Sequence, residues 1–121
     1  MMTSDELDNF INTFLQTWSR HDVDAIMDLM SDDCEFEPSS RAWGTHYKGA
    51  KAVREAVENL FKSAPDIQWR LIRYFAVDDE ITIEVVASGT NDKGEPFEIP
   101  ACDLLTLKDG KITSKRAYRK L

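Results

Sequence analysis

The sequence predicts an α+β fold in which three N-terminal helices pack against a strongly curved antiparallel sheet. Two observations carry this prediction. Apolar residues recur with a helical period up to residue 63, and with a period of two from residue 67 onward. Helices followed by a meander of strands are typical of α+β domains. The 121 residues, 42% of them apolar, correspond to a single domain over 1–121 with a buried core.

Three amphipathic segments form the predicted helical layer. The first covers residues 7–18, where apolar side chains follow the i, i+3, i+4 spacing. Thr3 and Glu6 precede it at the spacing of a capping box. A short second helix follows Asp22, a residue type that caps helices. The third covers residues 50–63.

The strand candidates follow a polar loop. "CEFEP" predicts a short strand before this loop, "SSRAWGTHYKG". The later candidates are residues 67–77, 80–90, 96–108 and 111–121. The turns between them, "DDE", "NDKGE" and "KDGK", are typical of hairpins. A sheet of this kind has to curve around its helices, and a ligand pocket is expected at the open end of the curve.

Composition and charge narrow the function classes. The net charge is −7, from 15 basic and 22 acidic residues, which argues against binding to nucleic acid or to anionic membranes. No apolar run has the length of a spanning helix, and the N-terminus lacks the features of a signal peptide. The cysteines and histidines have no metal-ligand spacing, and no cofactor motif is present. We therefore expect a cytoplasmic protein without metal or cofactor.

Asp103 is the most informative ionisable residue. In "ACDLLTL" it shares an alternating strand face with Ala101, Leu105 and Leu107. Apolar surroundings destabilise a charged carboxylate unless a cation or several donors pair with it. Two interpretations stay open. Asp103 is a functional acid in a pocket, or it is a structural carboxylate that binds the backbone or a lysine.

The chain as a whole resembles the SnoaL-like polyketide cyclase and ketosteroid isomerase group of the nuclear transport factor 2-like superfamily. The resemblance rests on "DVDAIMDLMSDDCEFEP", "YKGAKAVREAV" and "CDLLTLKDGKITSKRAYRK" in this order. It implies a cone of three helices and a bent sheet, and a homodimer formed through the outer sheet face. "EITIEVVA", with apolar residues on both faces, agrees with such a dimer. The scaffold hosts isomerases, cyclases, dehydratases, epoxide hydrolases and binding proteins, so the resemblance does not define the chemistry.

The ketosteroid isomerase pattern is only partly present. By the resemblance, its oxyanion-binding tyrosine corresponds to Phe14 and its proton-shuttling aspartate to Pro38. Its second oxyanion donor, an aspartic acid, corresponds to Asp103. Ala117 stands where limonene epoxide hydrolases need an acid. The resemblance therefore implies that neither of these two activities is present in its original form.

The resemblance also suggests cationic partners for Asp103. It places Lys115 and Arg119 on the pocket face of the last strand, where Lys115 would neutralise Asp103. Arg119 would bind a substrate carboxylate, enolate or carbonyl. Alternation alone leaves the opposite face, with Ile112 and Arg116, equally open. Glu84 aligns with a pocket position, although it lies on the less apolar face of its strand, and is a candidate base or partner for the two cations.

The remaining candidates are a histidine and three aromatic residues. His46 lies in the loop that should cross the pocket mouth, where it would act as a general base or be an ordinary exposed residue. Phe14 and Trp18 face inward on the first helix, and Trp43 lies in the loop. These three would line a cavity for a flat, hydrophobic ligand, and for the first two this role is compatible with a place in the core.

These residues lead to one functional hypothesis and two alternatives. The hypothesis is an isomerase, cyclase or dehydratase-type lyase that moves a proton next to the carbonyl of a small hydrophobic substrate. Asp103, Glu84 or His46 would be the acid or base, and Lys115 and Arg119 would stabilise the enolate. The alternatives are a non-catalytic module that binds small molecules and an interaction domain that uses its sheet face.

Overall fold

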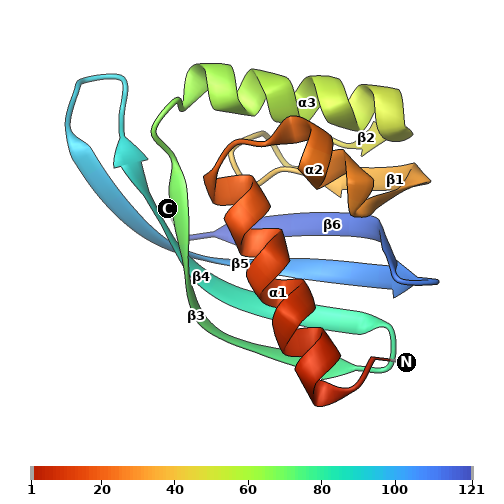
Figure 1. Ribbon diagram of the computed structural model, residues 1–121. Coiled ribbons are helices and arrows are strands. Elements are labelled where there is room, and N and C mark those ends of the chain that lie inside the picture. The colour runs from red at the N-terminus through yellow and green to blue at the C-terminus, as the bar shows by residue number, and fades with distance from the viewer. Residues whose placement is uncertain (1, 121) are drawn as a thin grey trace.

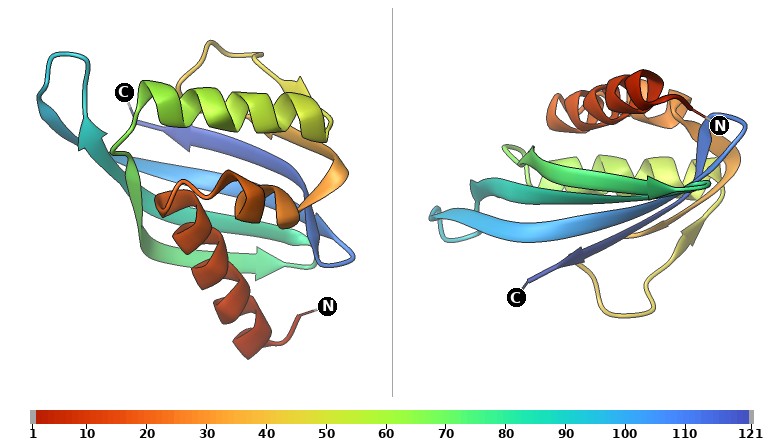
Figure 2. Two further views of the ribbon diagram at one scale, coloured as in Figure 1. Left: turned by 45° about the horizontal axis from the view of Figure 1, so that its top comes forward. Right: turned by 90° about the horizontal axis from the view of Figure 1, so that it is seen from below.

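The computed structural model describes residues 2–120 and, within them, three helices that cover one face of a six-stranded sheet (Figures 1 and 2). The helices are α1 (Ser4–Ser19), α2 (Val23–Asp28) and α3 (Ala50–Ser63). The strands are β1 (Met30–Glu37), β2 (Tyr47–Lys48), β3 (Gln68–Val77), β4 (Glu80–Thr90), β5 (Pro96–Lys108) and β6 (Lys111–Arg119). This arrangement confirms the α+β fold with three helices on a curved sheet. Over these residues no helix is long and apolar enough to cross a membrane.

The sheet has the strand order β2-β1-β6-β5-β4-β3. All neighbouring strands are antiparallel except β1 and β6, which pair in parallel. The expectation of an antiparallel sheet thus holds for every pair but one. The exception arises because β6 returns beside β1 from a separate part of the chain, so no hairpin turn sets their direction. Strand β2 was not predicted, since two residues are too few to show a periodic pattern.

The first helix begins as its sequence predicts. The Thr3 hydroxyl accepts a hydrogen bond from the Glu6 amide at 3.1 Å, and the Glu6 carboxylate accepts one from the Thr3 amide at 3.2 Å. This capping box satisfies two backbone N–H groups that the helix itself leaves without partners.

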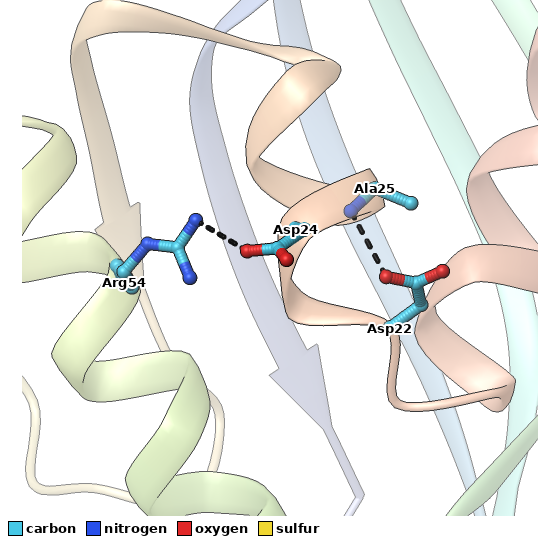
Figure 3. Close-up of polar contacts among 4 residues, drawn as sticks. All are labelled: Asp22, Asp24, Ala25 and Arg54. Atoms are coloured by element: carbon cyan, nitrogen blue, oxygen red, sulfur yellow. Dashed lines mark hydrogen bonds and ion pairs between the residues drawn. The ribbon is translucent and has the colours of Figure 1, made fainter.

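The short helix α2 is fixed at its N-terminus by Asp22, whose carboxylate accepts a hydrogen bond from the Ala25 amide at 3.1 Å (Figure 3). Two residues further, Asp24 forms an ion pair with Arg54 of α3 at 2.9 Å (Figure 3). The Asp24 side chain is largely exposed, so this pair contributes little to stability.

The hydrophobic core lies between the helices and the inner face of the sheet. It consists of Ile11, Phe14, Leu15, Trp18, Ile26, Met30, Cys34, Phe36, Val53, Val57, Ile81, Ile83, Val85, Leu105 and Ile112. Every helix and each of β1, β4, β5 and β6 contributes to this set, so the core holds both layers together.

An exposed carboxylate joins the loop after α3 to the end of β4. Asp66 accepts hydrogen bonds from the Thr90 amide at 3.1 Å and from the Thr90 hydroxyl at 2.6 Å. These bonds hold the pKa of Asp66 below its ordinary value of 3.8. Since a lowered pKa means that the folded state favours the ionised form, the bonds stabilise the fold above pH 3.8 and lose this effect as the pH falls through the lower, folded pKa.

We therefore expect Asp66→Ala to lower the melting temperature at pH 7 and to weaken the dependence of that temperature on pH below about 4. Circular dichroism melts from pH 2 to 7 measure both effects. Asp92→Ala, which removes an exposed acid of the neighbouring turn, is the matched control. If the melting temperature of Asp66→Ala fell below pH 4 as steeply as that of the wild type, the expectation would be wrong.

Candidate functional site

Asp103 lies on the inner face of the sheet, at the centre of β5. It pairs with Ile83 of β4 and with Ala117 of β6. Directly paired residues of neighbouring strands share a face, and Ile83 is part of the core. Asp103 is accordingly 7% exposed. The carboxylate on the apolar face of "ACDLLTL" is thus buried rather than turned to solvent.

A bulge decides which residues of β6 face inward. The pairing of β5 with β6 shifts between Thr106 and Leu107, and Thr113 is the extra residue. Ile112 and Lys115, three residues apart, are therefore both buried, at 1% and 6% exposure. Strict alternation cannot place both of them on one face. The sequence offered two alternating faces of β6, one with Ile112 and Arg116 and one with Lys115 and Arg119. The inner face combines them, with Ile112 from the first and Lys115 and Arg119 from the second.

Lys115 and Asp103 form a buried ion pair. The Lys115 Nζ lies 3.6 Å from the Asp103 Oδ1, and both side chains are at most 10% exposed. The same Nζ lies 4.3 Å from the centre of the Trp18 ring and 4.8 Å from that of Phe36. Ring faces carry partial negative charge and attract a desolvated ammonium group. The charge of Lys115 is thus balanced by one carboxylate and two aromatic rings.

Trp18 connects this ion pair to the rest of the core. Its ring centre lies 5.8–6.0 Å from those of Phe14, Phe36, Phe61 and Trp69, which come from α1, β1, α3 and β3. Tilted and edge-on contacts at this spacing are favourable for aromatic pairs. The indole that contacts Lys115 is therefore held from several sides.

A small cavity opens beside the ion pair, which we call the inner cavity. Its volume is about 60 Å³, enough for a few water molecules. Its lining consists of Trp18, Phe36, Pro38, Ser39, Ser40, Leu60, Ile67, Trp69, Ala87, Phe97, Ile99, Ala101, Asp103, Lys115, Ala117 and Arg119. The lining is mainly apolar, and Asp103, Lys115 and Arg119 are its charged members.

A wider cavity of about 390 Å³, the outer cavity, adjoins the first. The two share Phe36, Pro38, Ser40, Leu60, Phe97 and Arg119 in their linings. The outer cavity adds polar residues from the loop before β2, from α3 and from the β4–β5 turn, among them Arg41, Asn59 and Asn91. Of the three charged residues of the inner cavity, Arg119 alone also lines the outer cavity.

Glu84 does not face this site, which corrects its expected place in the pocket. It pairs with Arg73 of β3 and Cys102 of β5, on the side of the sheet opposite to Asp103. Its carboxylate forms an ion pair with Arg73 at 3.1 Å. The reason is the period of the strand, since Ile83 and Val85 on either side of Glu84 are buried in the core.

His46 and Trp43 also lie away from the cavities. The His46 Nε2 lies 2.9 Å from the carboxylate of Glu35. Glu35 pairs with Ser114, whereas its neighbour Phe36 pairs with the inward-facing Lys115, so His46 contacts the outer face. Trp43 is fully exposed in its loop. Sequence alone could not show that this loop carries both side chains outward.

Phe14 is buried in the core against Trp18 and does not line either cavity. Several lining residues were not singled out from the sequence, in particular Phe36, Phe97 and Ile99. The sequence could have indicated Phe97 and Ile99, because they lie three and two alternations before Asp103 on the same strand face. Phe36 could be recognised only from the parallel pairing that brings it opposite Lys115.

The cysteines offer no reactive nucleophile. Cys34 is fully buried, and burial raises the pKa of its thiol. Burial likewise raises the pKa of the Cys102 thiol, with a further contribution from the charges of Asp103 and Glu84. Both thiols are therefore neutral at pH 7, the less reactive form. In the part of the chain from 2 to 120, no three His, Cys, Asp or Glu residues are grouped to hold a metal ion.

Residues 11–115 match the family of the SnoaL-like domain. Among curated proteins no match is found. Many solved structures are similar in fold. One is SalBIII, an epoxide hydrolase/cyclase-like enzyme with a role in pyran ring formation in the polyether salinomycin, with a TM-score of 0.84, 20% identity, and 100% of this chain and 95% of SalBIII covered.

Two further structures have bound small molecules. A protein with a ketosteroid isomerase-like fold from Catenulispora acidiphila, in complex with trimethylamine, has a TM-score of 0.82 and 20% identity, with 93% of this chain and 85% of that chain covered. TerC, co-crystallised with polyporic acid, has a TM-score of 0.81 and 15% identity, with 93% and 90% covered. At these identities the likeness shows a shared fold.

Proposed function

The chain belongs to the SnoaL-like domain family, and we propose that Asp103 transfers a proton next to the carbonyl group of a small, flat, hydrophobic substrate. The carbonyl end of this substrate would enter the inner cavity, and its remaining part would extend into the adjoining outer cavity. The observation that carries this proposal is the buried pair of Asp103 and Lys115 at the end of an apolar cavity. A carboxylate in such a place is a base held near its target, and an ammonium group beside it stabilises negative charge.

The proposed step moves one proton and one charge. The Asp103 carboxylate takes a proton from the carbon next to the substrate carbonyl, and the electron pair of that C–H bond moves to the carbonyl oxygen. The negative charge thus passes from Asp103 to an enolate oxygen. At 3.6 Å from Asp103, Lys115 is close enough to attract the charge in both positions, provided that the oxygen lies on its cavity side.

The fate of the enolate sets the reaction class. Return of the proton from Asp103 to another carbon gives an isomer. Attack of the enolate carbon on a second carbonyl of the same molecule gives an aldol-type ring closure, in which the new alkoxide takes the proton from Asp103. Loss of water from that product would give a dehydrated ring. All three outcomes use the same two residues.

Hydrogen exchange tests the first step without knowledge of the natural substrate. In D₂O, the wild type should speed the exchange of the protons next to the carbonyl in flat ketones such as 2-tetralone, followed by proton NMR. Asp103→Asn should slow this exchange by about 10²–10⁴-fold, the usual contribution of a positioned acid or base.

Glu84→Gln is the matched control, since it removes a carboxylate from the opposite face of the same sheet. It should exchange as the wild type does. Exchange that is equally fast in Asp103→Asn would contradict the assignment of Asp103.

A non-catalytic module that binds small molecules is the second candidate. The Lys115 ammonium group already has one carboxylate and two aromatic rings as partners in the absence of a substrate. This favours a structural role for the ion pair, and hence a module that binds without catalysis. Ketones that bind to the wild type but show no accelerated exchange would support this candidate over the enzyme.

We also propose a homodimer formed through the outer face of the sheet. Phe75, Val77 and Tyr118 are 57%, 71% and 47% exposed, and their strand partners Thr82, Glu80 and Cys102 place them on this outer face. All three helices lie on the other face (Figure 2). Exposed apolar side chains on one uncovered face of a sheet indicate an interaction surface. Sedimentation at micromolar concentration should give the mass of a dimer, and Phe75→Glu should shift it toward the monomer. A wild type that is monomeric at every concentration would contradict the dimer.

A further inference from the structure

The linings of the inner and outer cavities share one cationic residue. Arg119 lines both of them, whereas Lys115 and Asp103 line only the inner one. A ligand that reaches from the outer cavity to the ion pair can therefore contact the Arg119 side chain at both cavities. This places Arg119 at a different point along the ligand from the reacting group.

The charges of the two cavities differ. In the inner cavity the charge of Lys115 is matched by Asp103. Arg119 forms no ion pair with any residue between 2 and 120, and Arg41 adds a second guanidinium to the outer cavity. The acidic residue of that cavity, Asp92, lies on the exposed β4–β5 turn. In a chain of net charge −7, this is a local excess of positive charge next to an apolar cavity.

The strand sets the distance between the two ends of the site. Lys115 and Arg119 are four residues apart beyond the bulge and lie on the same face of β6. At about 3.3 Å per residue, their Cα atoms are about 13 Å apart. A ligand whose ketone lies beside Lys115 in the inner cavity and whose anionic group meets Arg119 in the outer cavity is therefore elongated, with about 10 Å between these two groups.

We propose that the site takes an elongated, flat keto acid. Its ketone end enters the inner cavity beside Asp103 and Lys115, and its carboxylate is bound by Arg119, with Arg41 as a second contact. A guanidinium group presents two parallel N–H donors that match a carboxylate. This inference rests on the proposed function for the ketone end, and it adds the anionic end as the determinant of specificity.

The test compares an acid with its neutral isostere. The probe is 4′-acetylbiphenyl-4-carboxylic acid, which carries a ketone and a carboxylate at opposite ends, and the reference is its primary amide. Isothermal titration calorimetry at pH 7 should show that the wild type binds the acid at least about tenfold more tightly than the amide. Arg119→Gln should remove this preference, because it weakens binding of the acid and leaves binding of the amide unchanged.

Arg116→Gln is the matched control, because Arg116 lies on the same strand, is exposed and pairs with Glu37 and Leu104 on the outer face. It loses the same charge and should keep the preference for the acid. The short acid 4-acetylbenzoic acid should show no preference over its amide, since it cannot reach both ends. Equal binding of acid and amide by the wild type, an unchanged preference in Arg119→Gln, or no binding of the long acid at millimolar concentration would each overturn the proposal.

Exchange of the acetyl protons of the same probe separates this inference from the proposed function. A preference for the acid that depends on Arg119, without exchange, supports the anionic subsite and contradicts proton transfer. Accelerated exchange of the acetyl protons in both the acid and the amide, with equal binding of the two compounds, supports proton transfer and overturns the anionic subsite.

Discussion

Replacing Lys115 with methionine is expected to lower the free energy of unfolding by about 3–5 kcal/mol, the cost of removing one partner of a buried ion pair. Methionine has a similar volume, so packing against Trp18 and Phe36 is largely kept. The loss comes from Asp103, which is 7% exposed in the wild type and would keep a buried carboxylate without its cation. Urea unfolding followed by circular dichroism measures the difference.

The double variant Asp103→Leu with Lys115→Met shows whether this loss comes from the unpaired charge. Replacement of a whole buried pair by apolar residues is often neutral or stabilising, so we expect the double variant to be at least as stable as the wild type. Lys108→Met, at an exposed position of β5, is the control and should change stability by less than about 0.5 kcal/mol. A double variant that is no more stable than Lys115→Met would contradict the explanation by an unpaired charge.

Replacing Trp18 with alanine is expected to cost about 3–5 kcal/mol, as for other large aromatic residues removed from a core. Trp18 is 3% exposed and contacts aromatic rings from α1, β1, α3 and β3. The change would leave a void between the layers and would also remove one of the two rings that face the Lys115 ammonium group.

Trp43→Ala is the matched control for this experiment. It removes the same side chain from a fully exposed position of the loop, so stability should stay within about 0.5 kcal/mol of the wild type. Both variants are compared by urea unfolding. Equal stability of the two would contradict the central place of Trp18 in the core.

Strand alternation correctly predicted the sheet face of some charged residues but not of others. Alternation predicted that Asp103 shares a face with apolar residues, and it also indicated that Glu84 lies on the less apolar face of its strand. The resemblance pointed the other way for Glu84, and the structure follows the alternation. The same rule could not choose a face for β6, because the bulge at Thr113 changes the period in the middle of the strand.

The homodimer and the cytoplasmic location stay predictions, and so does every catalytic role. The family and the fold are established, since 105 consecutive residues, 11–115, match the SnoaL-like domain and the similar structures share its architecture. The fold alone does not select among the activities that this scaffold hosts.

The features that could be predicted from the amino-acid sequence alone are those that depend on local interactions. The capping box at Thr3, the helical spacing of apolar residues and the hairpin turns all act between residues close in the chain, so their patterns can be read directly. The site depends instead on contacts between distant segments. Lys115 meets Phe36 because β6 pairs in parallel with β1, and it meets Trp18 at the C-terminal end of α1. The loop before β2 carries His46 and Trp43 to the outside. Such contacts are settled by how the whole core packs, since no local pattern records which distant side chains share its interior.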